Sequence, residues 1–263
     1  MPEGKELHGG SYRWWPPTGD HTFLFEFNSL RFEYFDHYLA GWEGLKVLDV
    51  GCGGGYTCEY LARRKALVFG TDILPESLQE AHSHAEKNNL NIEYLLCTTD
   101  RLPYSDQAMD VVTCFDVLEH IPSKVQTLGE IYRVLKPGGW FFFDTYNKTF
   151  WSKLFMIWLG EILIRFISRG THHWFLFISP ADLSVLLKGR GFTKIEIAGI
   201  KPIRRSQAKM RVPVTVSSRG NTSVIYFGAA RKPAFPVDQL TSSLKMVALS
   251  SFPAPSGAPN HQL

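Results

Sequence analysis

Cysteines, targeting segments and long apolar runs are scarce in this 263-residue chain. It has four cysteines, no CxxC pair and no Cys/His spacing that fits a zinc site. Residues 1–10 lack the apolar stretch of a secretory signal, and no uncharged apolar run reaches membrane-spanning length. The nearest candidate, residues 150–167, contains Lys153, Glu161 and Arg165. We therefore expect a cytoplasmic protein without disulfide bonds.

An excess of charge of one sign is missing as well. The chain has 28 Lys and Arg residues against 25 Asp and Glu residues, a net charge of +3. This balance does not favour a dedicated nucleic-acid-binding protein, and we expect no nucleic-acid partner. Aromatic residues, in contrast, make up 14% of the chain, which predicts a pocket or surface for a flat apolar partner. No pattern in the sequence indicates an oligomeric state.

Short apolar runs alternate with helical patterns along most of the chain. Seven strands are expected, at residues 45–50, 66–70, 92–96, 109–114, 140–146, 192–200 and 223–230. Helices are expected at residues 56–64, 76–87, 125–135 and 179–189. Asn28 is a candidate N-cap for a further helix that ends near Tyr38. Because most strands are runs in which apolar residues predominate, the pattern predicts an α/β fold: a mostly parallel sheet of seven strands with helices on both faces.

Other segments fall outside this alternation. Residues 1–27 are rich in aromatic side chains and are expected to form a lead-in that covers part of the main domain, residues 28–232. An apolar insert at residues 148–178 follows the fifth strand. Residues 233–263 are rich in Pro, Ser and Ala without a periodic pattern, so we expect a flexible tail.

The strongest local signal is the sequence VLDVGCGGG at residues 47–55. A buried strand is expected to end there in a glycine-rich turn that begins a helix. Backbone N–H groups can approach a ligand in such a turn because no Cβ atom hinders them. Asp72 follows the next strand about twenty residues later, where a carboxylate can accept hydrogen bonds from both hydroxyls of a ribose. The spacing favours a ligand-binding loop over a turn without a ligand.

The end of this segment, DVGCGGG, resembles motif I of the class I S-adenosylmethionine-dependent methyltransferases. Residues 109–114 and 135–139 resemble two further motifs of that superfamily. The resemblance implies a Rossmann-like methyltransferase fold with S-adenosyl-L-methionine as the cofactor. Asp49 would lie near the cationic methionine end of this cofactor, with Gly51 and Gly53 passing beneath it.

Features outside the glycine loop narrow the resemblance. The tandem tryptophans at residues 14–15, NSLR at 28–31, FDVLEH at 115–120 and RGTHHW at 169–174 are similar to the ubiquinone-biosynthesis O-methyltransferase family. That family comprises polyprenyl-dihydroxybenzoate and demethylubiquinol O-methyltransferases. The resemblance implies methyl transfer to a phenolic or catechol hydroxyl of an apolar, polyprenylated quinone precursor. The alternatives are a secondary-metabolite O- or N-methyltransferase and an inactive, methyltransferase-like binding protein.

The resemblance also assigns contacts to the cofactor. Arg31 would pair with the methionine carboxylate through its guanidinium fork, Asp72 with the ribose and Phe115 with the adenine ring. Many members of the superfamily have an aspartate where this chain has Cys97 or Thr98. Recognition of the adenine amino group would then fall to Thr98 or to backbone carbonyls.

The implied reaction is in-line methyl transfer to an oxygen nucleophile, and it requires deprotonation of a phenol of pKa about 10. One device is a general base, with His120 and His172 as candidates. The other is a divalent ion, Mg²⁺ or Zn²⁺, on Asp116, Glu119 and His120, which helical spacing would bring to one face. The same string of residues is common in this superfamily without a metal, so both devices stay open.

The apolar insert allows three interpretations, of which the first two are compatible: a lid over the substrate, a helix that lies on a membrane, and a dimer face. On a helical wheel, residues 150–167 place Lys153, Glu161 and Arg165 on one arc and apolar residues on most of the remainder. Such a helix is expected to act as a lid over an apolar substrate, with peripheral contact to a membrane surface. A dimer face is the alternative.

Overall fold

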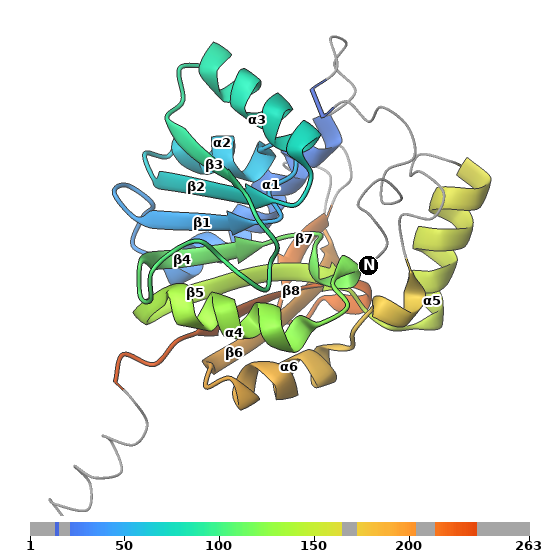
Figure 1. Cartoon of the computed structure of the whole chain (residues 1–263). Helices are drawn as coiled ribbons and strands as arrows, with labels where there is room; N and C mark the ends of the chain where they lie inside the picture. The colour runs from blue at the N-terminus through green and yellow to red at the C-terminus, as the bar shows by residue number, and fades with distance from the viewer. Residues whose placement is uncertain (1–13, 16–21, 165–172, 204–213, 236–263) are drawn as a thin grey trace, which may run out of the picture.

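The computed structural model describes residues 14–15, 22–164, 173–203 and 214–235, and it shows an α/β fold built on an eight-stranded sheet (Figure 1). The strands are β1 Lys46–Val50, β2 Leu67–Asp72, β3 Ile92–Leu96, β4 Met109–Cys114, β5 Leu135–Tyr146, β6 Thr193–Pro202, β7 Val214–Ser217 and β8 Asn221–Arg231. Their order is β3-β2-β1-β4-β5-β8-β6-β7. The first five strands are parallel, whereas β8 runs antiparallel to both β5 and β6.

Helices cover both faces of the sheet. They are α1 Thr22–Phe35, α2 Tyr56–Ala62, α3 Pro75–Lys87, α4 Lys124–Val134 and α6 Pro180–Gly189, with 3-10 turns η1 Asp36–Tyr38, η2 Leu118–His120 and η4 Trp174–Leu176. Buried side chains form two clusters: one joins α1, α2 and α3 to the sheet, and the other joins α4 and α6 to it. The predicted α/β class is thus confirmed.

The sheet has eight strands rather than the seven that the sequence predicts. The additional strand, β7, is the four-residue segment VTVS, which pairs with β6 at the edge of the sheet. So short a run gives too little apolar periodicity to be recognised as a strand. The other strands lie close to their predicted ranges, apart from β5, which begins at Leu135 rather than at Trp140.

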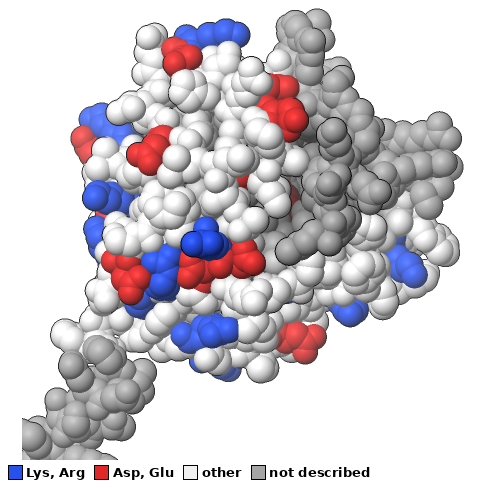
Figure 2. Space-filling view, viewed as in Figure 1, with Lys and Arg blue, Asp and Glu red and all other residues white. Residues whose placement is uncertain are grey.

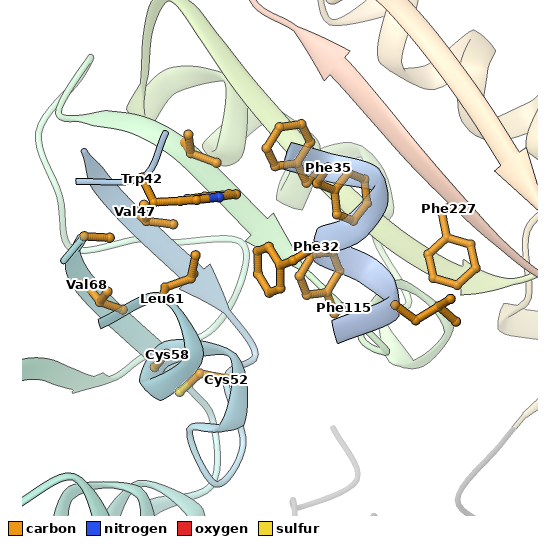
Figure 3. Close-up of a cluster of buried hydrophobic side chains, with 14 of the residues drawn as sticks. Phe32, Phe35, Trp42, Val47, Cys52, Cys58, Leu61, Val68, Phe115 and Phe227 are labelled. Atoms are coloured by element: carbon orange, nitrogen blue, oxygen red, sulfur yellow. The ribbon is translucent and has the colours of Figure 1, made fainter. Parts of the chain in front are cut away.

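Phenylalanine rings pack on both faces at the centre of the sheet. Phe141, Phe142 and Phe143 of β5 are fully buried, with Phe142 in the cluster under α1 and the other two in the opposite cluster. Phe35 of α1 stacks on Phe142 and Phe115 at centroid distances of 4.6 and 5.5 Å. Figure 3 shows Phe35 and Phe115 in this cluster. Full burial of such a side chain contributes about 1.5–3 kcal/mol, so this contact fixes α1 against the middle of the sheet.

Helix α1 begins earlier than the sequence predicts. We expect Asn28 as its N-cap, but the helix starts at Thr22 and Asn28 lies within it, almost completely buried. The Asn28 Oδ1 atom accepts hydrogen bonds from Arg31 Nη1 at 3.2 Å and from Thr57 Oγ1 at 3.3 Å. The N-cap prediction is wrong because side chains in its own helix and in α2, rather than backbone N–H groups, use the amide oxygen.

The insert after β5 stands away from the sheet (Figure 1). A capping box at Thr149 begins α5 Phe150–Ser152, and η3 Lys153–Ile164 follows as a π-helix with an i→i+5 pattern. The helical wheel for residues 150–167 assumes 3.6 residues per turn, so its polar arc does not apply to η3. Residues 165–172 lie outside the described residues.

The insert exposes a set of aromatic side chains, called here the insert surface. Its members are Phe150, Trp151, Phe155 and Trp158, which are 44% to 63% exposed. In the described part of the chain, no helix has the length and apolar character needed to cross a membrane. Acidic and basic residues are interspersed on the face of the molecule shown in Figure 2. The insert surface is therefore an apolar projection from a body of mixed surface charge.

Two predicted segments fall largely outside the described residues. These are residues 1–13 and 16–21 of the predicted lead-in, and residues 236–263 of the predicted tail. Trp14 and Trp15 are described, and both contact the glycine loop, as shown in the next section.

Gly228 in β8 provides a test of the packing between the last strand and β5. It lies opposite Phe143 in the antiparallel register, and a Cβ atom at Gly228 would overlap the Phe143 ring. Gly228→Ala should lower the free energy of unfolding by about 1–3 kcal/mol because the buried ring has to shift. Gly189→Ala in α6, where a Cβ atom meets nothing within 4 Å, is the control and should be neutral or stabilising by about 1 kcal/mol. Equal stabilities in urea denaturation would contradict this account.

Candidate active site

The glycine loop connects β1 to α2 through a left-handed backbone. Gly51, Gly53 and Gly55 have φ angles of +73°, +51° and +84°, a region that residues with a Cβ atom rarely adopt. The N–H groups of Gly51 and Cys52 donate to the Thr71 carbonyl at 2.7 and 2.9 Å. The loop is therefore fixed against the end of β2, without side chains at the glycines, as a ligand-binding turn requires.

Asp72, the last residue of β2, stands beside this loop. Its Oδ2 atom accepts a hydrogen bond from the Gly53 N–H at 2.8 Å, and Oδ1 accepts one from the Leu74 N–H at 2.9 Å. The side chain is half-buried, and a carboxylate oxygen can accept more than one hydrogen bond. The carboxylate predicted to bind a ribose thus also holds the glycine loop in place.

Asp49 is a buried carboxylate in β1. Its Oδ1 atom accepts a hydrogen bond from Thr113 Oγ1 at 2.6 Å, and the Cys58 thiol donates to Oδ2 at 3.5 Å. Burial raises the pKa of Asp49 to about 6, although these hydrogen bonds and the charge of Arg31 act in the opposite direction. A positive charge in the adjoining pocket would stabilise the ionised form of this group.

The Arg31 guanidinium joins three elements of the fold. It is 4% exposed, donates from Nε to Asp144 Oδ2 at 2.5 Å, and forms a second ion pair with Asp116 through Nη2. Burial acts to lower the pKa of Arg31, but the two carboxylates raise it above its ordinary value. Asp144 Oδ1 also accepts the backbone N–H of Asp116 at 2.8 Å. A single network therefore ties α1, β5 and the turn after β4 together.

These groups meet at one pocket, with an empty space of about 410 Å³ that includes open solvent at its mouth. The lining residues are Trp14, Arg31, Asp49, Gly51, Cys52, Tyr56, Thr57, Phe115 and Asp116. Four predicted cofactor contacts are among them: Arg31, Asp49, Gly51 and Phe115. The Arg31 guanidinium lies over the Phe115 ring, 4.8 Å from its centroid. The structure thus brings these four residues to one cavity.

The remaining predicted contacts do not line this pocket. Gly53 and Asp72 border it through the glycine loop, whereas Thr98 is exposed after β3. Sequence reasoning missed Tyr56, which directly follows the loop and could have been found from that position. It also missed Asp144. This residue lies near the carboxyl end of a central strand, a position that is typical of ligand sites in α/β folds.

The residues proposed to hold a metal ion do not form a ligand set. Asp116 pairs with Arg31, while Glu119 is fully buried and accepts a hydrogen bond from Thr145 Oγ1 at 2.7 Å. Burial, followed by the charge of Asp116, raises the pKa of Glu119 to about 8. Among the residues that the structure describes, no three His, Cys, Asp or Glu side chains are placed to hold a metal ion. The geometry gives the metal hypothesis no support.

Of the two histidines proposed as general base, His120 belongs to the described residues. His120 is half-buried at the end of η2 and is not among the residues that line the pocket. His172 lies outside the described residues. The identity of the base stays a prediction.

The fold and the glycine loop are those of the S-adenosylmethionine-dependent methyltransferases. A family described as a methyltransferase domain matches residues 48–143. A solved S-adenosylmethionine-dependent methyltransferase from Thermotoga maritima, described as a possible histamine N-methyltransferase, superposes with a TM-score of 0.58. The match has 16% sequence identity and covers 80% of this chain and 92% of that chain. At this identity the likeness concerns the fold alone.

Curated relatives define the family more narrowly. A ubiquinone biosynthesis O-methyltransferase from an Azoarcus strain is 36% identical over 225 residues, which cover 84% of this chain and 92% of the relative. A protein of the same name from Alkalilimnicola ehrlichii is 41% identical over 182 residues, covering 69% and 74%. The chain belongs to the ubiquinone biosynthesis O-methyltransferase family, and it is an S-adenosylmethionine-dependent O-methyltransferase.

The buried Asp49 carboxylate predicts a dependence of stability on pH. Its pKa is raised from an ordinary value of 3.8 to about 6 in the folded protein, so the stability it contributes is present at pH 4 and is lost as the pH rises through 6. Asp49→Asn removes this loss. The variant should gain roughly 1–3 kcal/mol relative to the wild type between pH 4 and pH 8. Thermal melting of both proteins at pH 4 and pH 8 without ligand measures the difference in stability. A difference that does not change with pH would refute the raised pKa of Asp49.

Proposed function

We propose that this enzyme transfers the methyl group of S-adenosylmethionine to a phenolic or catechol hydroxyl of an apolar, polyprenylated quinone precursor. The names of its relatives support an O-methyltransferase of ubiquinone biosynthesis. The observation that carries the proposal is the pocket in which the glycine loop, the Asp49 carboxylate and the Arg31 guanidinium face one space. This combination suits a ligand with a cationic centre and a free carboxylate. The competing function is that of a secondary-metabolite O- or N-methyltransferase.

The donor would lie across the glycine loop. Arg31 would pair with its methionine carboxylate in partial exchange for Asp116, whose side chain is 34% exposed, whereas that of Asp144 is fully buried. Phe115 lies beneath the same guanidinium, which favours a place in the methionine half of the site rather than beside the adenine ring, the contact that the family resemblance implies. Asp72 would accept the ribose hydroxyls. Charge-assisted hydrogen bonds of this kind contribute about 1.5–3 kcal/mol each.

Methyl transfer releases a proton, because a phenol becomes an ether while a sulfonium becomes a neutral thioether. The donor, when bound, supplies the activated methyl group. The protein aligns the acceptor oxygen and takes its proton, with His120 or His172 as the proposed base. A divalent ion on Asp116, Glu119 and His120 would require rearrangement, because Asp116 is paired with a cation and Glu119 is buried.

Turnover of a prenylated catechol with labelled S-adenosylmethionine tests the function. We expect one methyl group per acceptor oxygen by mass spectrometry. Asp72→Ala should weaken the binding of S-adenosylhomocysteine at least about tenfold in calorimetry, because it loses one or two charge-assisted hydrogen bonds. Asp72→Asn keeps one acceptor oxygen and should lose less. Wild-type affinity in Asp72→Ala, with the fold intact, would refute the donor assignment.

The same assay separates the open points of the mechanism. Turnover that EDTA abolishes and Mg²⁺ or Zn²⁺ restores would support a metal ion. Full turnover after exhaustive chelation leaves a general base, and His120→Ala and His172→Ala then identify it. Methylation of amine analogues without reaction of the catechol would favour the competing function.

We further propose that the insert brings this site to substrate held in a membrane. The insert surface is aromatic and exposed, and Lys148 and Lys153 lie over the Trp174 ring at 5.4 and 5.2 Å from its centroid. Trp174 Nε1 donates to the Thr149 carbonyl at 3.1 Å, which connects the two ends of the insert. Apolar side chains flanked by cations are typical of peripheral binding to anionic lipid.

Serine at Trp151, Phe155 and Trp158 should weaken co-sedimentation with anionic liposomes, because less apolar surface is buried at the interface. The apparent KM for a long-chain catechol in vesicles should rise, while a short, water-soluble catechol is methylated as before. Val185→Ser, which changes an exposed apolar residue of α6, is the matched control and should bind liposomes normally. If turnover of the soluble catechol collapses while liposome binding is untouched, the insert is a lid and the membrane proposal is wrong.

A further inference from the structure

Trp14 forms one wall of the pocket although it lies far from the glycine loop in sequence. Its side chain packs on the backbone of Gly53 and Gly54, where a Cβ atom at either glycine would overlap it. The same side chain lines the pocket together with Arg31 and Asp49. Trp14 is therefore in contact with the loop and open to the cavity at once.

Hydrogen bonds fix Trp14 in this position. Its backbone N–H donates to Glu80 Oε2 at 2.9 Å, and its indole Nε1 donates to Ser77 Oγ at 3.0 Å, both on α3. Its carbonyl accepts a hydrogen bond from the Tyr56 hydroxyl at the start of α2. The residue is thus held from two helices, and its ring has a defined place over the loop.

Trp15 anchors the same segment from outside the pocket. Its Nε1 atom donates to the Gly54 carbonyl at 2.7 Å, and its ring stacks on His84 of α3 with centroids 3.5 Å apart and planes 3° apart. His84 Nδ1 in turn lies 2.5 Å from Glu59 Oε1. Trp15 is not among the residues that line the pocket, so its contacts serve to position Trp14.

We propose that Trp14 is a donor-contacting residue of this enzyme and that Trp15 is the residue that positions it. The proposal rests on the proposed function, since it takes the pocket to be the site of the methyl donor. It adds a segment from outside the α/β domain to the donor site.

The composition of the pocket indicates that Trp14 favours the donor over the product. The other aromatic rings and carboxylates of the lining are those of Tyr56, Phe115, Asp49 and Asp116. Aromatic faces and carboxylates both attract a positive charge. The cation of the lining, Arg31, already has two carboxylate partners. The wall is therefore suited to a sulfonium, which the donor carries and the thioether product lacks.

Calorimetry on Trp14 variants tests the contact. Trp14→Ala should weaken the binding of S-adenosylmethionine about three- to thirtyfold, and that of S-adenosylhomocysteine less. Trp14→Phe should keep most of the affinity but lose much of the tryptophan fluorescence change that donor binding causes in the wild type. Phe235→Ala removes an exposed aromatic side chain outside the pocket lining. It is the matched control and should bind both ligands like the wild type.

A double variant tests the role of Trp15. Trp15→Ala should weaken donor binding toward the level of Trp14→Ala, and the variant with both changes should be no weaker than Trp14→Ala, because Trp15 acts through Trp14. Independent, additive losses would overturn the positioning role. Thermal melting without ligand checks that each variant is folded.

Two results would overturn the donor contact. Equal binding of the donor by Trp14→Ala would show that the indole does not touch it, and stronger binding would show that the indole occupies space the donor needs. Wild-type protein that binds neither S-adenosylmethionine nor S-adenosylhomocysteine would instead refute the proposed function. Failure of the inference and failure of the function are therefore distinguishable.

Discussion

One buried guanidinium connects the fold of this enzyme to its pocket. Arg31 reaches from α1 to Asp144 in β5 and to Asp116 after β4, and it also forms part of the cavity wall. Breaking a buried ion pair of this kind typically costs about 3–5 kcal/mol because a charge is left without a partner. The position of α1 and the shape of the proposed donor site therefore both depend on the ion pairs of Arg31.

The charges around the pocket are arranged at a cost to the empty protein. Burial raises the pKa of both Asp49 and Glu119, which means that their ionised forms are poorly solvated. A cationic ligand would compensate part of this cost for Asp49, whose carboxylate lines the cavity. The site thus gives up stability in the absence of a ligand, as is common where function requires unfavourable local arrangements.

The parts of this structure that could be predicted from sequence depend on local patterns. Short runs rich in apolar residues predict β3 and β4, and the glycine loop with Asp72 predicts the class of ligand site. The contacts that could not be predicted are long-range. Arg31 meets Asp144 across 113 residues, and Trp15 meets Gly54 across 39, with no spacing that would reveal either pair. The predicted N-cap role of Asn28 is wrong for a similar reason, since one of its hydrogen-bond partners, Thr57, lies in another helix.

The strand order has a consequence for how the enzyme is made. β8 is the last strand in the described part of the chain, yet it lies inside the sheet, between β5 and β6. During synthesis, the five parallel strands and the glycine loop are complete long before β8 leaves the ribosome, and β5 then has an unpaired edge. Non-local strand pairing is slow, and unpaired edges are sites of aggregation. The nascent chain is therefore most prone to aggregation after β5 is complete and before Arg231 is synthesised. A chaperone would protect the chain most in this interval.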